Sequence, residues 1–304
     1  MQRTSYSTPP SEPGRSHPPA RVGVVVHPRR DIEGAVAAIR AWASTHGVAL
    51  GQVPIAGQTR WVADPIEIES CDLVLALGGD GTALAALHAA APASRPVVGV
   101  ACGSIGLLTS VPAGSLPLAL EQLSAGSWEQ KSVPALAVAT EAAELGFAIN
   151  DFVVVRNGTG QVMTEVTVDG ERYARTAGDG LVVATPVGST AYTMAAGGPI
   201  LTPGLQGIVV TPLAPHGGMA PPLVVGPDSR LGVSVEAGFG GSRFEIDGQE
   251  VGTDALEVTV SLRREYAPLV SVADQEPLLT GLRRRGLVVD SPRILARDAR
   301  AQPG

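Results

Sequence analysis

Leu73 to Thr82 reads Leu-Val-Leu-Ala-Leu-Gly-Gly-Asp-Gly-Thr, an apolar run that stops at two glycines and is followed by one carboxylate. Five apolar residues without polar alternation are typical of a strand buried on both faces, as in a parallel sheet covered by helices. The carboxylate, Asp80, then follows the carboxyl end of that strand. Open α/β sheets bind phosphorylated ligands at this edge.

The glycines that follow the strand permit a tight turn. Gly78, Gly79 and Gly81 allow conformations and close ligand approaches that other residues do not. Thr82 is expected to be the N-cap of a helix over residues 83–91, because that stretch is rich in alanine and leucine. A helix N-terminus beside Asp80 would favour a bound phosphate, although a tight connection without a ligand is the alternative.

Further strands and helices alternate on either side of this segment. Val22 to Val26 and Val97 to Ala101 are short buried strands. Helices are expected over 32–46, with Asp31 as its cap, and over 116–123. Alternation of this kind implies right-handed crossovers and a mostly parallel sheet. The sequence therefore predicts a Rossmann-like α/β domain.

A second glycine-punctuated turn follows the strand at 97–101. Residues 102–109 read Cys-Gly-Ser-Ile-Gly-Leu-Leu-Thr, with Gly103 and Gly106 as the flexible positions. This turn could join the first around one crevice. The pattern by itself favours a simple loop.

From about residue 128 the pattern changes to short strands separated by Gly, Pro, Asn and Asp. Such runs predict a β-rich domain, and the Asp169-Gly170 and Asp247-Gly248 pairs suit tight hairpins. The predicted strands are 135–140, 147–156, 162–168, 171–175, 180–184, 207–211, 223–225, 231–236, 243–246 and 257–262.

The sequence thus predicts an α/β domain followed by an all-β domain. Residues 1–20 are rich in Pro, Ser and Gly and are expected to be a disordered tail. A short basic helix over 277–285 should help the last segment pack back on the first domain. The predicted divisions are 1–20, 21–127, 128–265, 266–292 and a loose tail at 293–304.

Composition limits the function classes. A net charge of −7 argues against a nucleic-acid surface, and no apolar run suits a membrane span. The N-terminus lacks the succession of basic, apolar and small residues that is typical of a signal peptide, so we expect a cytoplasmic protein. Cys71 and Cys102 lack metal-ligand spacing. Lys131 is the only lysine, so a lysine-based phosphate clamp is excluded.

Residues 178–199 form the most unusual segment of the β-rich half. It contains Thr-Pro-Val-Gly-Ser-Thr-Ala-Tyr at 185–192, and a helix is expected over 191–196. The hydroxyls of Ser189, Thr190 and Tyr192 suit sugar and amide groups, and the tyrosine ring offers a stacking face. A capped helix without a ligand is the alternative.

Asn150 and Asp151 place an amide beside a carboxylate at the entry to an apolar strand. The pair could bind the two hydroxyls of a ribose or could fix a turn, and both readings stay open. No Ser-His-Asp order or metal cluster emerges.

Taken together, these segments resemble bacterial ATP- or polyphosphate-dependent NAD kinases over residues 21–290. The similar motifs are Gly78 to Thr82, Asn150-Asp151, Gly178-Asp179-Gly180, Thr185 to Tyr192 with Ala195 to Pro199, Thr211 to His216 and Asp247-Gly248-Gln249. Lipid and sphingoid kinases share a turn like Gly78 to Thr82 but not the segment at 178–199, and phosphofructokinases, which also have a related Gly-Gly-Asp-Gly turn, are a weaker comparison.

The resemblance implies a nucleotide cleft between the two domains and Mg²⁺-dependent phosphoryl transfer to the 2′-hydroxyl of the adenosine ribose of NAD. It implies a homo-oligomer whose ligands are NAD and ATP or polyphosphate, with no nucleic acid or membrane partner. Asp80 would be the catalytic base. The implied NAD-binding residues are Gly79, Asp80, Gly81, Asn150, Asp151, Asp179, Thr190, Ala191, Tyr192 and Gln249. The implied phosphate-donor turns contain Gly78, Gly79, Gly81, Thr82, Gly103 and Gly106, and the sequence identifies no metal ligand.

The chain departs from that family where arginines or polar residues are usual. The departures are Ala101, Ser104, Val133 or Pro134, Gly217 and Pro221. They leave two alternatives to a kinase acting on NAD. One is a non-catalytic NAD(P)-binding sensor, and the other is a kinase for a lipid or another hydroxyl substrate.

Overall fold

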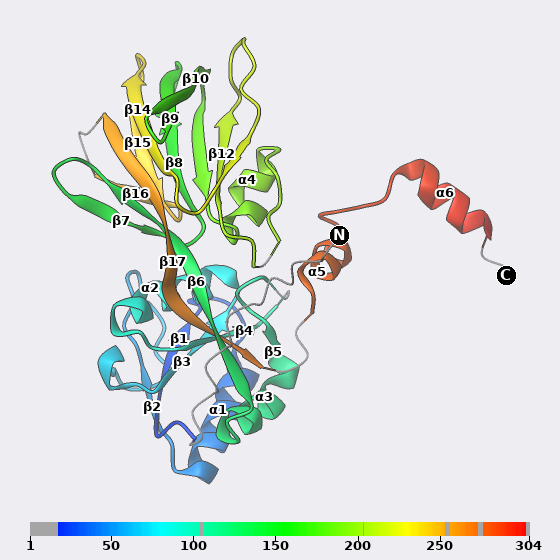
Figure 1. Cartoon of the computed structure of the whole chain (residues 1–304). Helices are drawn as coiled ribbons and strands as arrows, with labels where there is room; N and C mark the ends of the chain where they lie inside the picture. Colours follow the sequence, from blue (N-terminus) through cyan, green and yellow to red (C-terminus); the bar gives the residue numbers. More distant parts are fainter. Residues whose placement is uncertain (1–17, 104–105, 203, 253–255, 273–275, 302–304) are drawn as a thin grey trace, which may run out of the picture. The chain divides into compact units, whose positions relative to one another are not determined.

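The structure is a computed structural model that describes residues 18–103, 106–202, 204–252, 256–272 and 276–301 (Figure 1). The chain forms two compact units. We call them the α/β unit, with residues 18–83, 98–129 and 271–301, and the β unit, with residues 84–97 and 130–270. Most of the predicted N-terminal tail, residues 1–17, lies outside the described residues.

The helices are α1 (Glu33–His46), α2 (Asp80–Ala90), α3 (Leu116–Ser124), α4 (Tyr192–Ala195), α5 (Leu278–Arg284) and α6 (Pro292–Ala301). The strands are β1 (Arg21–Val26), β2 (Ala49–Gln52), β3 (Leu73–Gly78), β4 (Val97–Ala101), β5 (Val111–Pro112), β6 (Trp128–Ala139), β7 (Glu144–Ala148), β8 (Asp151–Arg156), β9 (Val162–Val168), β10 (Glu171–Gly178), β11 (Gly180–Ala184), β12 (Ile208–Leu213), β13 (Leu223–Val225), β14 (Arg230–Ala237), β15 (Ser242–Ile246), β16 (Gln249–Val251) and β17 (Glu257–Val272). None of the helices in the described ranges is both long and apolar enough to cross a membrane.

The α/β unit contains the predicted parallel sheet. Its strands follow the order β4-β3-β1-β2, with β1 parallel to both β2 and β3 and with β5 parallel to β4. Every residue of β3 is buried, as its apolar run predicts. Helices α1 and α3 pack together (Figure 1). Across this contact the Trp42 indole N–H donates to Ser124 Oγ over 2.9 Å. The predicted Rossmann-like architecture is confirmed.

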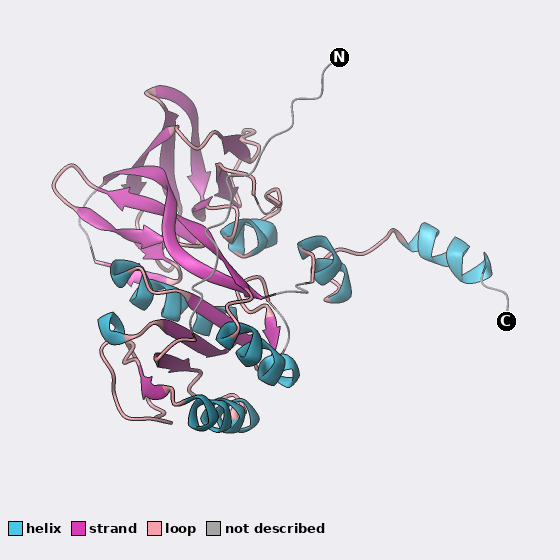
Figure 2. Ribbon diagram, turned by 60° about the horizontal axis from the view of Figure 1, so that its bottom comes forward, coloured by secondary structure: helices cyan, strands magenta, loops and turns pink. Residues whose placement is uncertain are grey.

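Strands predominate in the β unit (Figure 2). One antiparallel sheet has the order β13-β12-β11-β8-β15-β16, and the other strands follow the order β10-β9-β14-β17, with β6 beside β17 and β7. Side chains from both sets share one hydrophobic core. Phe152 of β8 and Phe244 of β15 meet edge to face in it, with ring centroids 5.5 Å apart. Period-2 alternation of apolar residues supplies this packing.

Both predicted Asp-Gly hairpins are present. Asp169 and Gly170 join β9 to β10 with φ angles of 52° and 86°. Asp247 and Gly248 join β15 to β16 with φ angles of 49° and 75°. Two successive positive φ angles match the right-handed twist of the flanking strands, which is why this dipeptide is favoured there.

Some elements differ from the prediction. The single strand expected over 147–156 is two strands, β7 and β8, because the backbone at Ile149 and Asn150 binds a side chain instead of a ladder partner. The basic helix is confirmed as α5, whereas 293–301 belongs to helix α6 where a loose tail was expected. Pro292 at the first helical position, followed by alanine, leucine and arginine, accounts for α6.

Candidate functional site

The glycine turn of the α/β unit leads directly into α2. The helix begins at Asp80, so the expected N-cap role of Thr82 is wrong. The N–H groups of Thr82 and Ala83 donate to the carbonyl of Gly79, which closes the first turn. A Cβ atom at Gly78 would lie 2.2 Å from Thr82 Oγ1, so only glycine fits this turn.

The Asp80 carboxylate is held by the second glycine turn. Oδ1 accepts from the N–H groups of Leu108 and Thr109, at 3.1 Å each, and from Thr109 Oγ1 at 2.9 Å. Oδ2 accepts from the Leu107 N–H at 2.8 Å. A Cβ at Gly106 would lie 1.9 Å from Oδ1. These hydrogen bonds fix the position of the carboxylate and leave acceptor capacity mainly on Oδ2.

The two glycine turns lie side by side, although the sequence pattern alone favoured a simple loop for the second. The Cys102 N–H donates to the carbonyl of Gly78 over 2.7 Å. Arg30, which the sequence analysis did not select, reaches both turns from the segment after β1. Its Nη1 donates to the Cys102 carbonyl at 3.3 Å. In the sequence, the indication that Arg30 belongs to the site was its position after the carboxyl end of the buried strand β1.

In the β unit, the Asp247 carboxylate fixes the segment that carries Asn150 and Asp151. Oδ1 accepts from their two N–H groups at 2.7 and 3.0 Å, and Oδ2 accepts from the Ile149 N–H at 2.8 Å. Nε2 of His88, on α2, donates to Oδ2 over 2.6 Å. Asp247 and His88 are therefore positioning residues that the sequence analysis did not assign to the site.

Asp151 is a buried carboxyl group with an altered acidity. Burial is the main cause that raises its pKa to about 7, and the negative charge of Asp247 adds to the rise. The backbone N–H of Tyr192 donates to this carboxylate and partly offsets both effects. A group that titrates near neutral pH inside a polar cluster is typical of functional sites.

Hydroxyl groups in the segment after β11 make hydrogen bonds that stabilise the fold. Thr185 Oγ1 donates to the Ile149 carbonyl at 2.5 Å. Ser189 is fully buried, and its hydroxyl donates to the Pro186 carbonyl and accepts from the Leu201 N–H. The predicted sugar-binding role of Ser189 is therefore wrong.

Thr190, Ala191 and Tyr192 follow that buried serine. The expected helix over 191–196 is only the single turn α4, and its Tyr192 N–H binds Asp151 rather than facing an open anion site. Ala191 is exposed, and Tyr192 is 42% exposed. Thr190 Oγ1 donates to the Val187 carbonyl over 3.1 Å, so its oxygen still has acceptor capacity. An exposed ring next to Asp151 suits stacking on a planar ligand.

Asp179 lies apart from Asp151. Strand β11 pairs Ala184 with Asp151 and Gly180 with Val155, so Asp179 lies at the opposite end of the strand. At about 3.3 Å per residue, the separation from Asp151 is about 16 Å. Asp179 instead pairs with Arg156, with Nε and Oδ1 2.6 Å apart. Gln249 is exposed at the start of β16.

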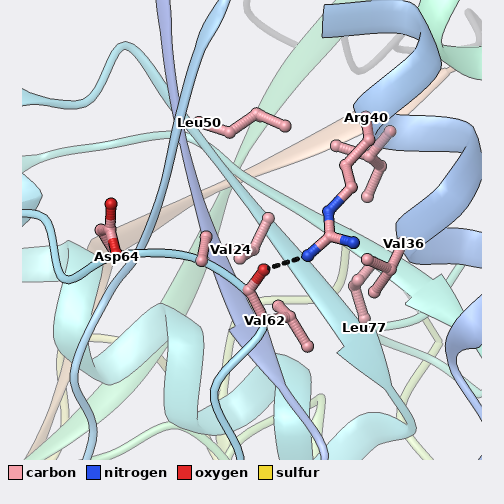
Figure 3. Close-up of a pocket in the computed structure, with 9 residues that line it drawn as sticks. Val24, Val36, Arg40, Leu50, Val62, Asp64 and Leu77 are labelled. Atoms are coloured by element: carbon pink, nitrogen blue, oxygen red, sulfur yellow. Dashed lines mark hydrogen bonds between the residues drawn. The ribbon is translucent and has the colours of Figure 1, made fainter.

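A cavity of about 330 Å³ lies elsewhere in the α/β unit, between α1 and the sheet (Figure 3). Its walls are mainly the apolar side chains of Val24, Ile39 and Leu77. The guanidinium of Arg40 donates to the Val62 carbonyl over 2.6 Å at this cavity (Figure 3). The cavity contains no residue of the two glycine turns, so it is separate from the candidate phosphate site.

Two family models match the chain and define its class as a small-molecule kinase. The ATP-NAD kinase N-terminal domain matches residues 22–128, and the ATP-NAD kinase C-terminal domain matches residues 149–272. The NAD kinase of Burkholderia thailandensis is 36% identical over 208 residues, which is 66% of this chain and 69% of that protein. The NAD kinase of Nocardia farcinica is 40% identical over 186 residues, or 59% of this chain and 57% of that one. The chain belongs to the NAD kinase family and is an enzyme of that family.

Solved structures agree in fold. Yeast NADH kinase complexed with NADH aligns with a TM-score of 0.76 at 19% identity, over 94% of this chain and 93% of that one. An NAD kinase from Archaeoglobus fulgidus in complex with ATP aligns with a TM-score of 0.69 at 25% identity, over 88% and 96% of the two chains. The predicted combination of an α/β fold with a β-rich fold is confirmed.

Proposed function

We propose that the chain transfers a phosphoryl group from ATP or polyphosphate to the 2′-hydroxyl of the adenosine ribose of NAD, which makes NADP. The observation that carries the proposal is the Asp80 carboxylate, fixed in position by four hydrogen bonds beside two glycine turns. Family membership supports NAD as the acceptor, and the neighbour in complex with ATP supports ATP as the donor.

Asp80 acts as the general base in this proposal. Oδ1 already accepts three hydrogen bonds, whereas Oδ2 accepts one, so Oδ2 is the oxygen that takes the proton of the hydroxyl. A positioned base contributes about 10²- to 10⁴-fold to a rate. The remaining acceleration comes from alignment and charge stabilisation, which dominate phosphoryl transfer.

The β unit binds the acceptor. Asn150 and Asp151 would bind ribose hydroxyls, and the exposed ring of Tyr192 would stack on the adenine. Asp247 and His88 orient that segment through its backbone and do not themselves contact the substrate in this proposal. Asp179, about 16 Å from Asp151 along β11, would serve the nicotinamide end of the extended dinucleotide.

Mg²⁺ would enter with the donor. The residues that the structure describes contain no group of three or more His, Cys, Asp or Glu side chains suited to a metal ion. Magnesium is commonly held by substrate phosphates, waters and one or two carboxylates, which fits this residue set. When bound, it would neutralise charge on the donor phosphates.

The test is an assay of the purified full chain with NAD⁺ or NADH, with ATP or polyphosphate, and with Mg²⁺ or EDTA. The wild type should form NADP⁺ or NADPH only with the metal. Asp80→Asn should lower turnover by about 10²- to 10⁴-fold, and because its amide would face the Leu107 N–H, a melting curve checks that the variant is folded at the assay temperature. Asp64→Asn, which changes an exposed carboxylate of the same unit, is the matched control. Absence of product with every donor and acceptor would refute the proposal.

A dinucleotide sensor is the second candidate, because Val133 is buried and Pro221 stands where the family carries an arginine. Tight NAD(H) or NADP(H) binding by calorimetry without turnover would favour it. We further propose a homo-oligomer, which light scattering tests, and a cytoplasmic location, which cell fractionation tests. The domain boundaries at 20, 127, 265 and 292 stay predictions, and limited proteolysis tests them.

A further inference from the structure

The guanidinium of Arg30 lies against both glycine turns of the α/β unit. Its Nη1 donates to the Cys102 carbonyl at 3.3 Å. A Cβ atom at Gly79 would lie 3.4 Å from Nη2, and one at Gly103 would lie 2.3 Å from Nη1. The two glycines therefore provide the space that the guanidinium fills.

The segment that carries Arg30 is fixed by three hydrogen bonds. Nδ1 of His27 accepts from the N–H groups of Arg29 and Arg30, at 3.1 Å each. Arg60 Nη1 donates to the Arg30 carbonyl over 2.7 Å. Burial, with the charges of Arg30 and Arg29, lowers the pKa of His27, which favours the neutral ring that can accept. A fixed backbone reduces the entropy lost when the side chain binds a ligand.

The charge of Arg30 is not neutralised within the part of the chain that the structure describes. Other arginines pair with carboxylates, such as Arg156 with Asp179 and Arg283 with Asp290. Arg30 has no salt bridge to a described carboxylate, and one carbonyl uses only one of its five N–H donors. A planar cation with free donors, set on two glycine turns, fits a ligand with several anionic oxygens.

We propose that Arg30 binds the phosphate groups of the donor at the turns of Gly79 and Gly103. This proposal rests on the phosphoryl transfer proposed above and adds the residue that recognises the donor. Arginine performs the task in a chain whose only lysine is Lys131. The guanidinium comes from the segment between β1 and α1, whereas Ser104 stands in the sequence where the family commonly carries an arginine.

Three variants of the full chain test the proposal. Arg30→Gln removes the charge, Arg30→Lys keeps it without the planar fork, and Arg29→Gln removes the same charge from the exposed neighbour. We measure KM for ATP and for NAD⁺ separately, the melting temperature, and the Kd of inorganic tripolyphosphate by calorimetry without NAD⁺. Arg30→Gln should raise KM for ATP and Kd for tripolyphosphate by about 10- to 100-fold and leave KM for NAD⁺ unchanged. Arg30→Lys should give values of KM for ATP and Kd for tripolyphosphate between those of the wild type and Arg30→Gln. Arg29→Gln should have the wild-type values of both constants.

The outcomes separate the two proposals. If the wild type forms NADP⁺ and Arg30→Gln leaves both donor constants unchanged, the role of Arg30 is refuted alone. An equal rise in both KM values with a lower melting temperature also refutes it, because that result indicates a structural residue. If the wild type makes no NADP⁺ but binds tripolyphosphate in an Arg30-dependent manner, the reaction is refuted while phosphate binding by Arg30 is confirmed.

Discussion

Asp151→Asn should stabilise the protein, and more so as the pH rises. The Asp151 carboxyl is 7% exposed, and its pKa is raised from 3.8 to about 7, mainly by burial and then by the charge of Asp247. The folded protein therefore holds a proton that the unfolded chain has already released. Wild-type stability falls as the pH rises from about 4 to 7, and the full penalty is present above pH 7. A shift of about three units corresponds to about 4 kcal/mol as an upper limit.

The assay is urea unfolding of the full chain and the variant at several pH values between 5 and 8. Asparagine is neutral and keeps an oxygen for the Tyr192 N–H, so the variant should gain stability over the wild type toward pH 8. Asp228→Asn, at an exposed carboxylate of the same unit, should keep the wild-type pH profile. A stability difference between Asp151→Asn and the wild type that does not change with pH would refute the reasoning.

Two further substitutions test the positioning contacts. Gly106→Ala should lower turnover on the order of 10²-fold, because its Cβ would lie 1.9 Å from Asp80 Oδ1. The control is Gly34→Ala on α1, whose Cβ would meet no atom within 4 Å, and this variant should remain active in the same assay. Asp247→Asn should lower the free energy of unfolding by about 1–3 kcal/mol, because its amide would face a backbone N–H and His88; an unchanged melting curve would contradict this.

Local sequence patterns predicted several strands well. The predicted bounds of β4, β9, β11 and β13 match the structure, since apolar runs between glycine and proline signals depend on neighbouring residues only. The predicted N-cap at Thr82 was wrong because the Gly79 carbonyl already closes the first turn of α2. Propensity cannot show where a turn ends when glycines permit several geometries.

The contacts that organise the site could not be predicted in the same way. His88 and Asp247 are 159 residues apart, and Asp80 and Thr109 are 29 apart. No pattern of spacing links such pairs, because their contact follows from how the strands pair and pack. Arg30 was missed for a different reason, since arginines are usually solvated and only its fixed segment and the two glycines distinguish it.

The four hydrogen bonds to Asp80 also affect how genetic data on this protein would be read. Asp80→Ala would leave three backbone N–H groups and one hydroxyl without their acceptor, at about 1–3 kcal/mol for each that stays buried. Such a loss approaches the whole stability of a typical domain. Cells degrade destabilised proteins, so steady-state abundance would fall several-fold. A complementation screen would then score Asp80→Ala as inactive through low abundance as well as lost chemistry, and only normalisation to protein level would separate the two.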